Sequence, residues 1–249
     1  MNKTITLSVD SYKGVDGTSL SSARCSQIVQ EYEMLERIGG KEITYLELQD
    51  EAAKNELFPR AKSQKSVIRT IFPLLKKIEF VNYEGAFPAN KCFTNLGTQF
   101  VLACRALENV TDKTPHKYEI ISRLENIKRN AQRIGLIKMH NNPEYKSHNM
   151  WIALKLLKEL RIMHWNEFLY TLHCLEEGNT VDDAIADIKS NKKEIDEIVF
   201  VNEKDEVLAN TCYSYLRSYL EEAGLISKVS SLESKILEEA EGFYAQINL

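Results

Sequence analysis

The stretch from Arg60 to Lys77 constrains the fold more than any other part of the sequence. Six Lys or Arg residues and no acidic residue lie between Leu57 and Ile78. Apolar residues recur there at helical spacing, namely Val67, Ile68, Ile71, Leu74, Leu75 and Ile78. A helix of this kind packs one face on a core and presents cations on the other. The pattern predicts either a DNA recognition helix or a plain amphipathic helix whose solvated face is basic.

The flanking segments favour the recognition helix. A helical pattern over residues 20–38 ends at a Gly-Gly pair, as a helix C-terminus does. Residues 43–53 carry an apolar stripe typical of a second helix. Residues 78–83 and 91–94 flank a turn that contains Gly and Pro, which predicts a hairpin wing. Together these segments predict one winged-helix unit at residues 20–95.

One residue of the basic stretch conflicts with a long helix. Pro73 has no backbone N–H, and its ring clashes with the preceding helical turn. The sequence therefore predicts that the recognition helix stops near Phe72 or kinks there.

A Gly-Leu-Ile motif indicates internal repetition. Residues 124–139 and 215–229 both have the pattern of a helix stopped by glycine and followed by a short strand. The alternative is that this tripeptide is only a common helix stop. Farther along, residues 149–160 and 165–175 predict a helical hairpin, residues 181–188 and 194–201 short helical turns, and residues 230–247 an acidic amphipathic helix.

The expected fold class is mainly α with short β-hairpins, built from tandem winged-helix (helix-turn-helix) units plus a helical hairpin. The expected domains are an N-terminal arm (1–19), a winged-helix unit (20–95), a second degenerate winged-helix-like unit (96–147) and a helical third unit with a C-terminal helix (148–249).

Composition excludes several classes of protein. With 43% hydrophobic and 27% charged residues the chain is typical of a globular protein, and we expect it to be cytoplasmic, because it shows no leader-like start and no long apolar run. Its five cysteines form no C-x-x-C, which argues against a disulfide framework and a zinc site. Nucleotide-binding loops and H-E-x-x-H are absent as motifs. We therefore expect no cofactor.

The charge is unevenly distributed along the chain. Residues 117–138 hold six basic residues against two acidic ones, whereas residues 176–206 hold eleven acidic residues against four lysines. Because binding to a polyanion depends on where charge lies, the basic faces are expected within the first 140 residues.

Nuclease chemistry would require an acid-x-Lys string on a strand, where Mg²⁺ and a water meet the phosphate. Two such strings exist, Glu144-Tyr-Lys146 and Glu233-Ser-Lys235. The first follows a proline in a polar loop and the second lies in a helical pattern. The sequence therefore favours no catalytic site in this chain, with Mg²⁺ needed only where a nuclease partner or site exists.

Residues 148–193 resemble a segment of the AlwI-like type IIS restriction endonucleases. The matching strings are Leu154-Lys-Leu-Leu-Lys-Glu-Leu160, Asn166-Glu-Phe168 and Ile185-Ala-Asp-Ile188. Those enzymes, and more distantly FokI, look like strings of winged-helix units that recognise an asymmetric DNA site and continue into a nuclease domain. This chain ends at Leu249, before such a domain. The resemblance implies a recognition subunit of a restriction-modification system, a split relative, or an unrelated winged-helix regulator.

DNA contacts are expected from three groups of residues. The recognition stretch contributes Arg60, Lys62, Ser63, Gln64, Lys65, Ser66 and Arg69, with Gln64 and Arg69 as base readers. The wing contributes Asn82, Asn90 and Lys91, and a second basic face contributes Lys117, Arg123, Lys128, Arg129 and Arg133.

The first hypothesis is a sequence-specific duplex-DNA-binding protein that works with a nuclease subunit. The second is a winged-helix transcription regulator or replication initiator, a homodimer with its seam at residues 232–243. The third is a helical protein-interaction scaffold whose basic helices are merely solvated.

Overall fold

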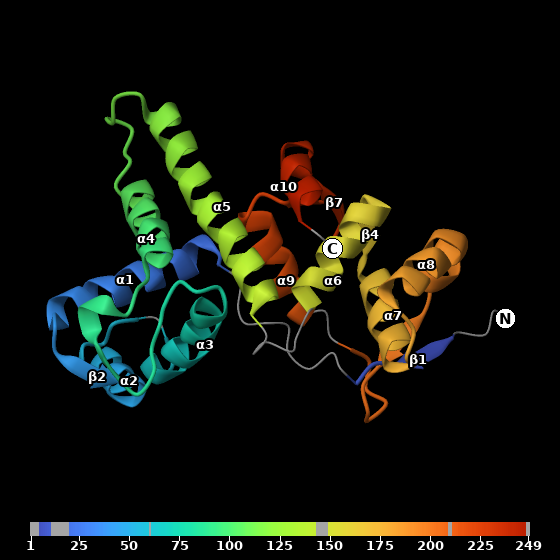
Figure 1. Cartoon of the computed structure of the whole chain (residues 1–249), viewed down its shortest axis with the longest axis horizontal. Coiled ribbons are helices and arrows are strands. Elements are labelled where there is room, and N and C mark those ends of the chain that lie inside the picture. The colour runs from blue at the N-terminus through green and yellow to red at the C-terminus, as the bar shows by residue number, and fades with distance from the viewer. Residues whose placement is uncertain (1–4, 11–19, 60, 143–148, 209–210, 248–249) are drawn as a thin grey trace. The chain divides into compact units, whose positions relative to one another are not determined.

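The computed structural model describes residues 5–10, 20–59, 61–142, 149–208 and 211–247. The described chain is mainly helical with a few short strands, as the sequence predicts (Figure 1). It divides into two compact units, residues 17–146 and residues 147–249 together with 1–16. The first has 20 Lys and Arg against 15 Asp and Glu, and we call it the basic unit; the second has 12 against 21, and we call it the acidic unit. None of the described helices has the length and apolar character that crossing a bilayer requires.

The basic unit begins with helices whose ends are fixed by local bonds. Its elements are α1 (Ser22–Ile38), β2 (Glu42–Thr44), α2 (Tyr45–Lys54), α3 (Gln64–Lys77), β3 (Ala86–Pro88), the 3-10 helix η1 (Ala89–Lys91), α4 (Asn95–Glu108) and α5 (Lys117–Asn141). Helix α1 ends at Gly39, whose φ of 71° suits glycine. Helix α2 begins with a capping box, in which Thr44 and Glu47 each accept a bond from the other's backbone N–H. Both helices therefore lie where the sequence predicts them.

The predicted hairpin wing forms differently. Residues 78–83 and 91–94 share a single antiparallel bridge, Val81 with Phe93, in place of two paired strands. The intervening chain folds back, so that β3 pairs antiparallel with β2 and places Phe87 opposite Ile43. Both of these side chains are buried. Burial of Phe87 explains why the turn lies against its own unit and does not extend as a free hairpin.

Pro73 does not end α3. The helix continues through it to Lys77, so the prediction of a stop near Phe72 is wrong. Pro73 is exposed, whereas Phe72 and Leu74 on either side are buried. Packing of the apolar face therefore outweighs the hydrogen bond that proline removes.

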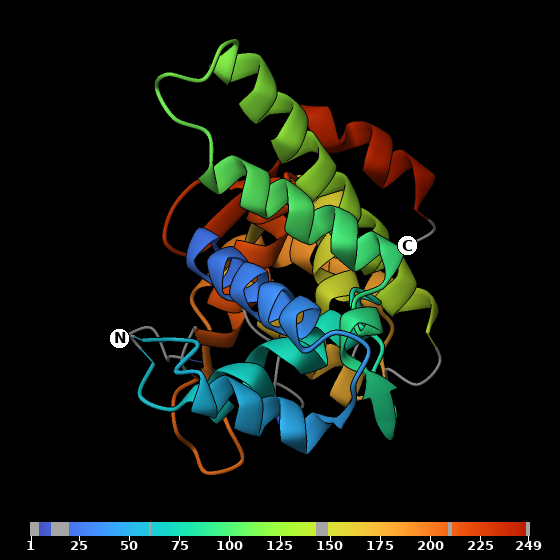
Figure 2. The same ribbon diagram turned by 90° about the vertical axis from the view of Figure 1, so that its left-hand side faces the viewer.

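Gly135 does not end a helix either. It lies inside α5, and the predicted strand after it is helical. A Cβ at this position would come within 2.9 Å of the Ile78 Cβ, so glycine here allows α5 to approach the end of α3 closely. Helices α4 and α5 run side by side in antiparallel directions (Figures 1 and 2). The predicted domain boundary after residue 95 falls inside the basic unit, at the start of α4.

The acidic unit contains two small sheets and five helices among the described residues. Its elements are β1 (Thr6–Ser8), α6 (Asn149–Leu160), β4 (Ile162–His164), α7 (Trp165–Glu176), α8 (Val181–Asp196), β5 (Val199–Val201), α9 (Thr211–Glu222), β6 (Ile226–Lys228), β7 (Glu233–Ile236), the 3-10 helix η2 (Glu238–Ala240) and α10 (Glu241–Gln246). Strand β1 pairs in parallel with β5, and the order of the other sheet is β4-β7-β6, antiparallel throughout.

Two helical predictions in this unit are wrong and one motif is confirmed. Residues 199–201 form β5, and the predicted helix over 230–247 is replaced by β7 and the short α10. In β7 Ser234 and Ile236 are buried and Lys235 between them is exposed, which is the alternation of a strand. Gly224, with a φ of 65°, does separate a helix from a strand, as the Gly-Leu-Ile motif predicts.

Candidate nucleic-acid interface

The outer side of α3 presents a continuous polar surface. The helix buries Val67, Ile68, Ile71, Phe72, Leu74 and Leu75. On the other side five residues are exposed, Lys65, Ser66, Arg69, Thr70 and Pro73, and Lys62 is exposed just before the helix; we call these six residues the α3 face. Residues three and four apart share a side of a helix, so these positions follow one another along its length. The structure therefore brings together the basic residues predicted to lie there.

The cations of α3 differ in the partners they already have. Lys65 forms an ion pair with Asp50 of α2. Lys76 lies 3.5 Å from Glu84 and 5.1 Å from the centre of the Tyr83 ring. Among the residues that the structure describes, Lys62 and Arg69 form no ion pair. An anionic ligand could therefore contact Arg69 without breaking an ion pair. Contact with Lys65 would require the ion pair between Lys65 and Asp50 to break.

Gln64 is not placed to read a base. Its side-chain carbonyl accepts from the Phe58 N–H at 2.7 Å, and its amide NH₂ donates to the Phe58 carbonyl at 2.8 Å. Both polar ends of the side chain are thus used within the protein. Gln64 fixes the segment before α3 to the first turn of the helix, and its predicted role as an adenine reader does not fit this geometry.

The two predicted serines have different surroundings. Ser63 is the N-cap of α3 and accepts from the Ser66 N–H at 3.3 Å. Sequence reasoning missed this cap, although a serine directly before the apolar pattern is its usual signal. It also missed Thr70, whose hydroxyl donates to the Ser66 carbonyl at 2.7 Å and which lies beside Arg69 on the α3 face.

The predicted wing residues lie beside β3 rather than on a hairpin. Asn82, Asn90 and Lys91 have exposed side chains. Their segment is held by its backbone, because the Asn82 N–H donates to the Cys92 carbonyl at 2.8 Å. Arg60 lies outside the described residues.

The five basic residues predicted on α5 do not form one face. Lys128 is buried and lies 3.0 Å from Glu125, so it cannot contact DNA as a surface residue. Lys117 pairs with Asp112 and Arg123 with Glu119, each at 2.6 Å. Arg129 and Arg133 are half-buried. Five positions separate Arg123 from Lys128, which turns them to different sides of the helix.

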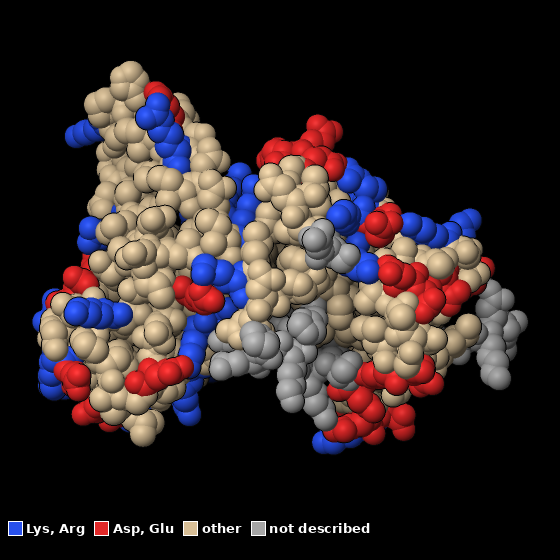
Figure 3. Space-filling model, viewed as in Figure 1, with Lys and Arg blue, Asp and Glu red and all other residues tan. Residues whose placement is uncertain are grey.

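Charge also distinguishes the surfaces of the two units. In Figure 3 acidic side chains gather over the α8 part of the acidic unit, where Asp182, Asp183 and Asp187 are exposed. Basic and acidic side chains are interspersed over the basic unit in the same view. The negative charge over α8 would repel a polyanion.

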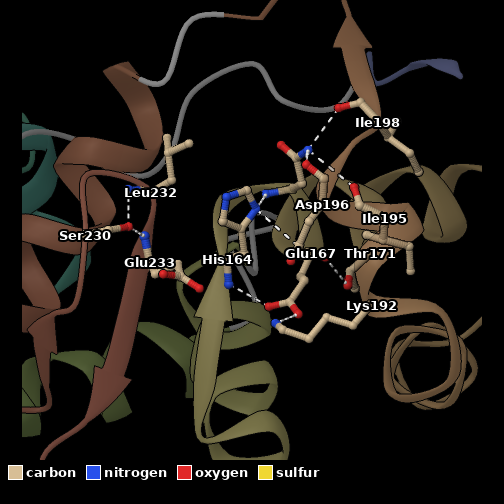
Figure 4. A network of polar contacts seen from close by, with 11 residues as sticks. His164, Glu167, Thr171, Lys192, Ile195, Asp196, Ile198, Ser230, Leu232 and Glu233 are labelled. Carbon is tan, nitrogen blue, oxygen red and sulfur yellow. Dashed lines mark hydrogen bonds and ion pairs between the residues drawn. The ribbon is translucent and has the colours of Figure 1, made fainter. Parts of the chain in front are cut away.

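A polar network in the acidic unit joins α7 to the end of α8 (Figure 4). The His164 N–H donates to Glu167 Oε2 at 2.5 Å, and Glu167 forms an ion pair with Lys192. Asn166 donates to the carbonyls of Asp196 and Ile198 at 2.8 and 2.9 Å. These bonds cap α7 and join it to the end of α8, so the network has a structural role.

The acid-x-Lys string at Glu233 lies on a strand, contrary to the prediction that it is helical. Its backbone register places Glu233 opposite His164 in β4. Among the described residues, no group of three or more His, Cys, Asp or Glu could hold a metal ion. Glu144 and Lys146 lie outside the described residues.

Comparisons with protein-family models, with curated proteins and with solved structures find no match to this chain.

Proposed function

We propose that the basic unit binds duplex DNA through the α3 face. The observation that carries this proposal is the pattern of exposure on α3, where one side is buried and the other presents Lys65 and Arg69 with two hydroxyl residues, and Lys62 is exposed just before the helix. A helix of this shape fits the major groove, and its cations can contact phosphates and base edges together.

The order of elements supports the proposal. Helix, strand, helix, helix and a returning strand follow one another from α1 to β3, and β3 pairs with β2. In the acidic unit α6, β4, α7, α9, β6 and β7 follow in a similar order, with α8 and β5 inserted, and the sheet order is β4-β7-β6. Both resemble the arrangement of winged-helix proteins, which use the helix before the last strands for recognition.

Roles on the α3 face follow from its chemistry. Arg69 is the base reader, because an unpaired guanidinium can bond both O6 and N7 of guanine. Lys62 and Lys65 contact phosphates, and release of counterions makes binding salt-dependent. Gln64 holds the first turn of α3 in place and does not touch DNA.

The finer proposal is that this recognition serves a restriction-type system. It rests on the resemblance of residues 148–193 to AlwI-like enzymes and requires a partner that supplies the nuclease chemistry and its Mg²⁺. The site recognised is then short and asymmetric.

A salt series of binding to a randomised duplex pool, with sequencing of the bound fraction, tests the proposal. We expect the Arg69→Ala variant to enrich no preferred sequence from the pool. Its binding free energy for the site preferred by the wild type should be weaker by about 1–3 kcal/mol. Lys62→Ala should weaken binding to all sequences equally. It should also reduce the slope of the log binding constant against log salt concentration by about one. The control is Lys54→Ala, an exposed lysine at the end of α2.

Two results would contradict the proposal. No retention of DNA at low salt would remove DNA binding altogether. If Arg69→Ala lowered the affinity for enriched and random duplexes equally, α3 would contact phosphates only and would have no role in sequence recognition.

A further inference from the structure

Thr70 lies in the middle of α3, next to Arg69, and its side chain is exposed. Its hydroxyl donates to the Ser66 carbonyl at 2.7 Å, one helical turn earlier. A threonine Cβ carries one hydroxyl and one methyl group, so a hydroxyl bonded to the helix backbone also fixes the direction of the methyl. The O–H donor of Thr70 is thus used within the helix, and the methyl group remains for contact with a ligand.

A second apolar group lies one turn farther along the helix. Pro73 is three positions after Thr70 and four after Arg69, so its ring shares the outer side of α3 with both. Pro73 is exposed and has no N–H to donate, whereas Phe72 and Leu74 on either side of it are buried. The outer side of α3 therefore places the Arg69 guanidinium next to a small apolar patch formed by Thr70 and Pro73.

The edges of base pairs in the major groove differ in one apolar group. Only thymine carries a methyl group there, on C5, whereas the other three bases present hydrogen-bond donors and acceptors. A methyl group on the protein forms no hydrogen bond with those polar edges, but it can remove a thymine methyl from water. The chemistry of the patch formed by Thr70 and Pro73 therefore matches thymine.

We infer that the Thr70 methyl, beside the Pro73 ring, contacts the 5-methyl group of a thymine in the base pair next to the guanine bonded by Arg69. This contact rests on the proposed function, because the same face of α3 binds the DNA. Arg69 and Thr70 are adjacent in the sequence and point about 100° apart around the helix, so they contact neighbouring base pairs. Recognition at the second base pair then depends on one methyl group and not on hydrogen bonds.

Replacing thymine by uracil tests the contact from the side of the DNA. Uracil lacks the 5-methyl group and keeps every hydrogen bond of the base pair. The affinity of the wild type is measured by titration for the site enriched from the random duplex pool, and for the same duplex with uracil at the thymine next to the guanine. We expect the uracil duplex to bind about fourfold more weakly, which is the effect of leaving one methyl group in water.

Two substitutions of Thr70 test the contact from the side of the protein. Thr70→Ser keeps the hydroxyl and loses the methyl, so this variant should bind the thymine and uracil duplexes equally. Thr70→Val keeps a methyl and loses the hydroxyl, so it is the matched control and should retain a difference of about fourfold. Because Thr70 is exposed, neither substitution disturbs the core. Comparison of the variants on the same two duplexes cancels any effect of uracil on the duplex itself.

The outcomes distinguish the thymine contact from DNA binding by α3. If an enriched site depends on Arg69 but uracil binds as well as thymine, the thymine contact is wrong and DNA binding by α3 stands. The same holds if Thr70→Ser retains the full difference between the two duplexes, or if the enriched site has no thymine next to the guanine. Failure to bind any duplex would overturn both.

Discussion

Among the residues that the structure describes, each unit buries one glutamate completely, and the two glutamates have opposite surroundings. Glu167 in the acidic unit accepts from the His164 N–H and pairs with Lys192. Glu31 in the basic unit is equally buried, but neither carboxyl oxygen has a hydrogen-bond partner among the described residues. Burial raises the pKa of the Glu31 carboxyl well above its ordinary value, against a smaller opposing effect of Arg24.

The comparison shows two ways in which a core accepts a carboxyl group. The Glu167 carboxyl group has both a cation partner and a backbone donor, so removing it leaves Lys192 without its partner and the His164 N–H without its acceptor. Glu31 has no such compensation, and the carboxyl is accommodated as the neutral acid. Glu167 should therefore stabilise the acidic unit. Glu31 should destabilise the basic unit at any pH at which a glutamate in the unfolded chain is ionised.

The largest loss of stability is expected for Glu167→Ala. The substitution removes the cap on His164, the partner of Lys192 and a fully buried side chain. We expect a fall of about 3 kcal/mol in the free energy of unfolding, measured by urea denaturation. Glu47→Ala is the control, because Glu47 completes the equivalent capping box on α2 while exposed, and its loss should be smaller. Equal losses would show that burial adds nothing to this cap.

Glu31→Gln should have the opposite sign. An unfolded glutamate has a pKa of about 4.3, and burial raises the folded value above it. Stability from Glu31 is then fully present below the unfolded pKa and is lost as pH rises through the folded pKa. The variant does not titrate, so it should gain stability over the wild type at pH near 8 and show little difference at pH near 4.

Urea denaturation at both pH values measures this difference. Glu33→Gln is a suitable control, since Glu33 lies on the same helix and is exposed near Arg105. If the difference in the free energy of unfolding between Glu31→Gln and the wild type were the same at both pH values, Glu31 would contribute no pH dependence to stability.

A second contrast is between α3 and α9, the helices that our proposal places in corresponding positions of the two units. Arg69 on α3 points outward, whereas Arg217 on α9 is buried and donates to the carbonyls of Ser230 and Ser231 at 3.1 and 2.7 Å. Helix α3 thus exposes its arginine, and α9 uses its arginine to hold the turn between β6 and β7.

Arg217→Ala should lower the free energy of unfolding by about 2 kcal/mol, because two charge-assisted bonds are lost and two carbonyls are left without this donor. Arg69→Ala should leave it unchanged within error and lower only DNA affinity. Thermal and urea unfolding of both variants, with binding measured in parallel, checks the pair. Loss of stability in Arg69→Ala would mean that the α3 face has a structural role.

Sequence patterns located the helices well and the strands poorly, for a physical reason. Helix α3 has fourteen residues, long enough for its apolar period to be recognised, although the sequence predicted a stop or a kink near Phe72. Strand β7 has four, too few for alternation to be distinguished from a helical pattern. Burial of Lys128 and the bonds from Gln64 to Phe58 depend on tertiary contacts. The basic character of the α3 face could therefore be predicted from the sequence. Which polar residues face outward and which form bonds within the protein could not.

The smallest expected effect concerns Gln64, and it distinguishes a support from a reader. Gln64→Ala removes both bonds to Phe58, which are partly buried, and should cost about 1 kcal/mol of stability in urea denaturation. Sequence preference and the salt slope of DNA binding should remain those of the wild type, because no DNA contact is lost. A base-reading Gln64 would give the reverse result, with unchanged stability and relaxed preference at one base pair. Gln30→Ala is the control, since Gln30 is an exposed glutamine on α1 and lies outside the α3 face.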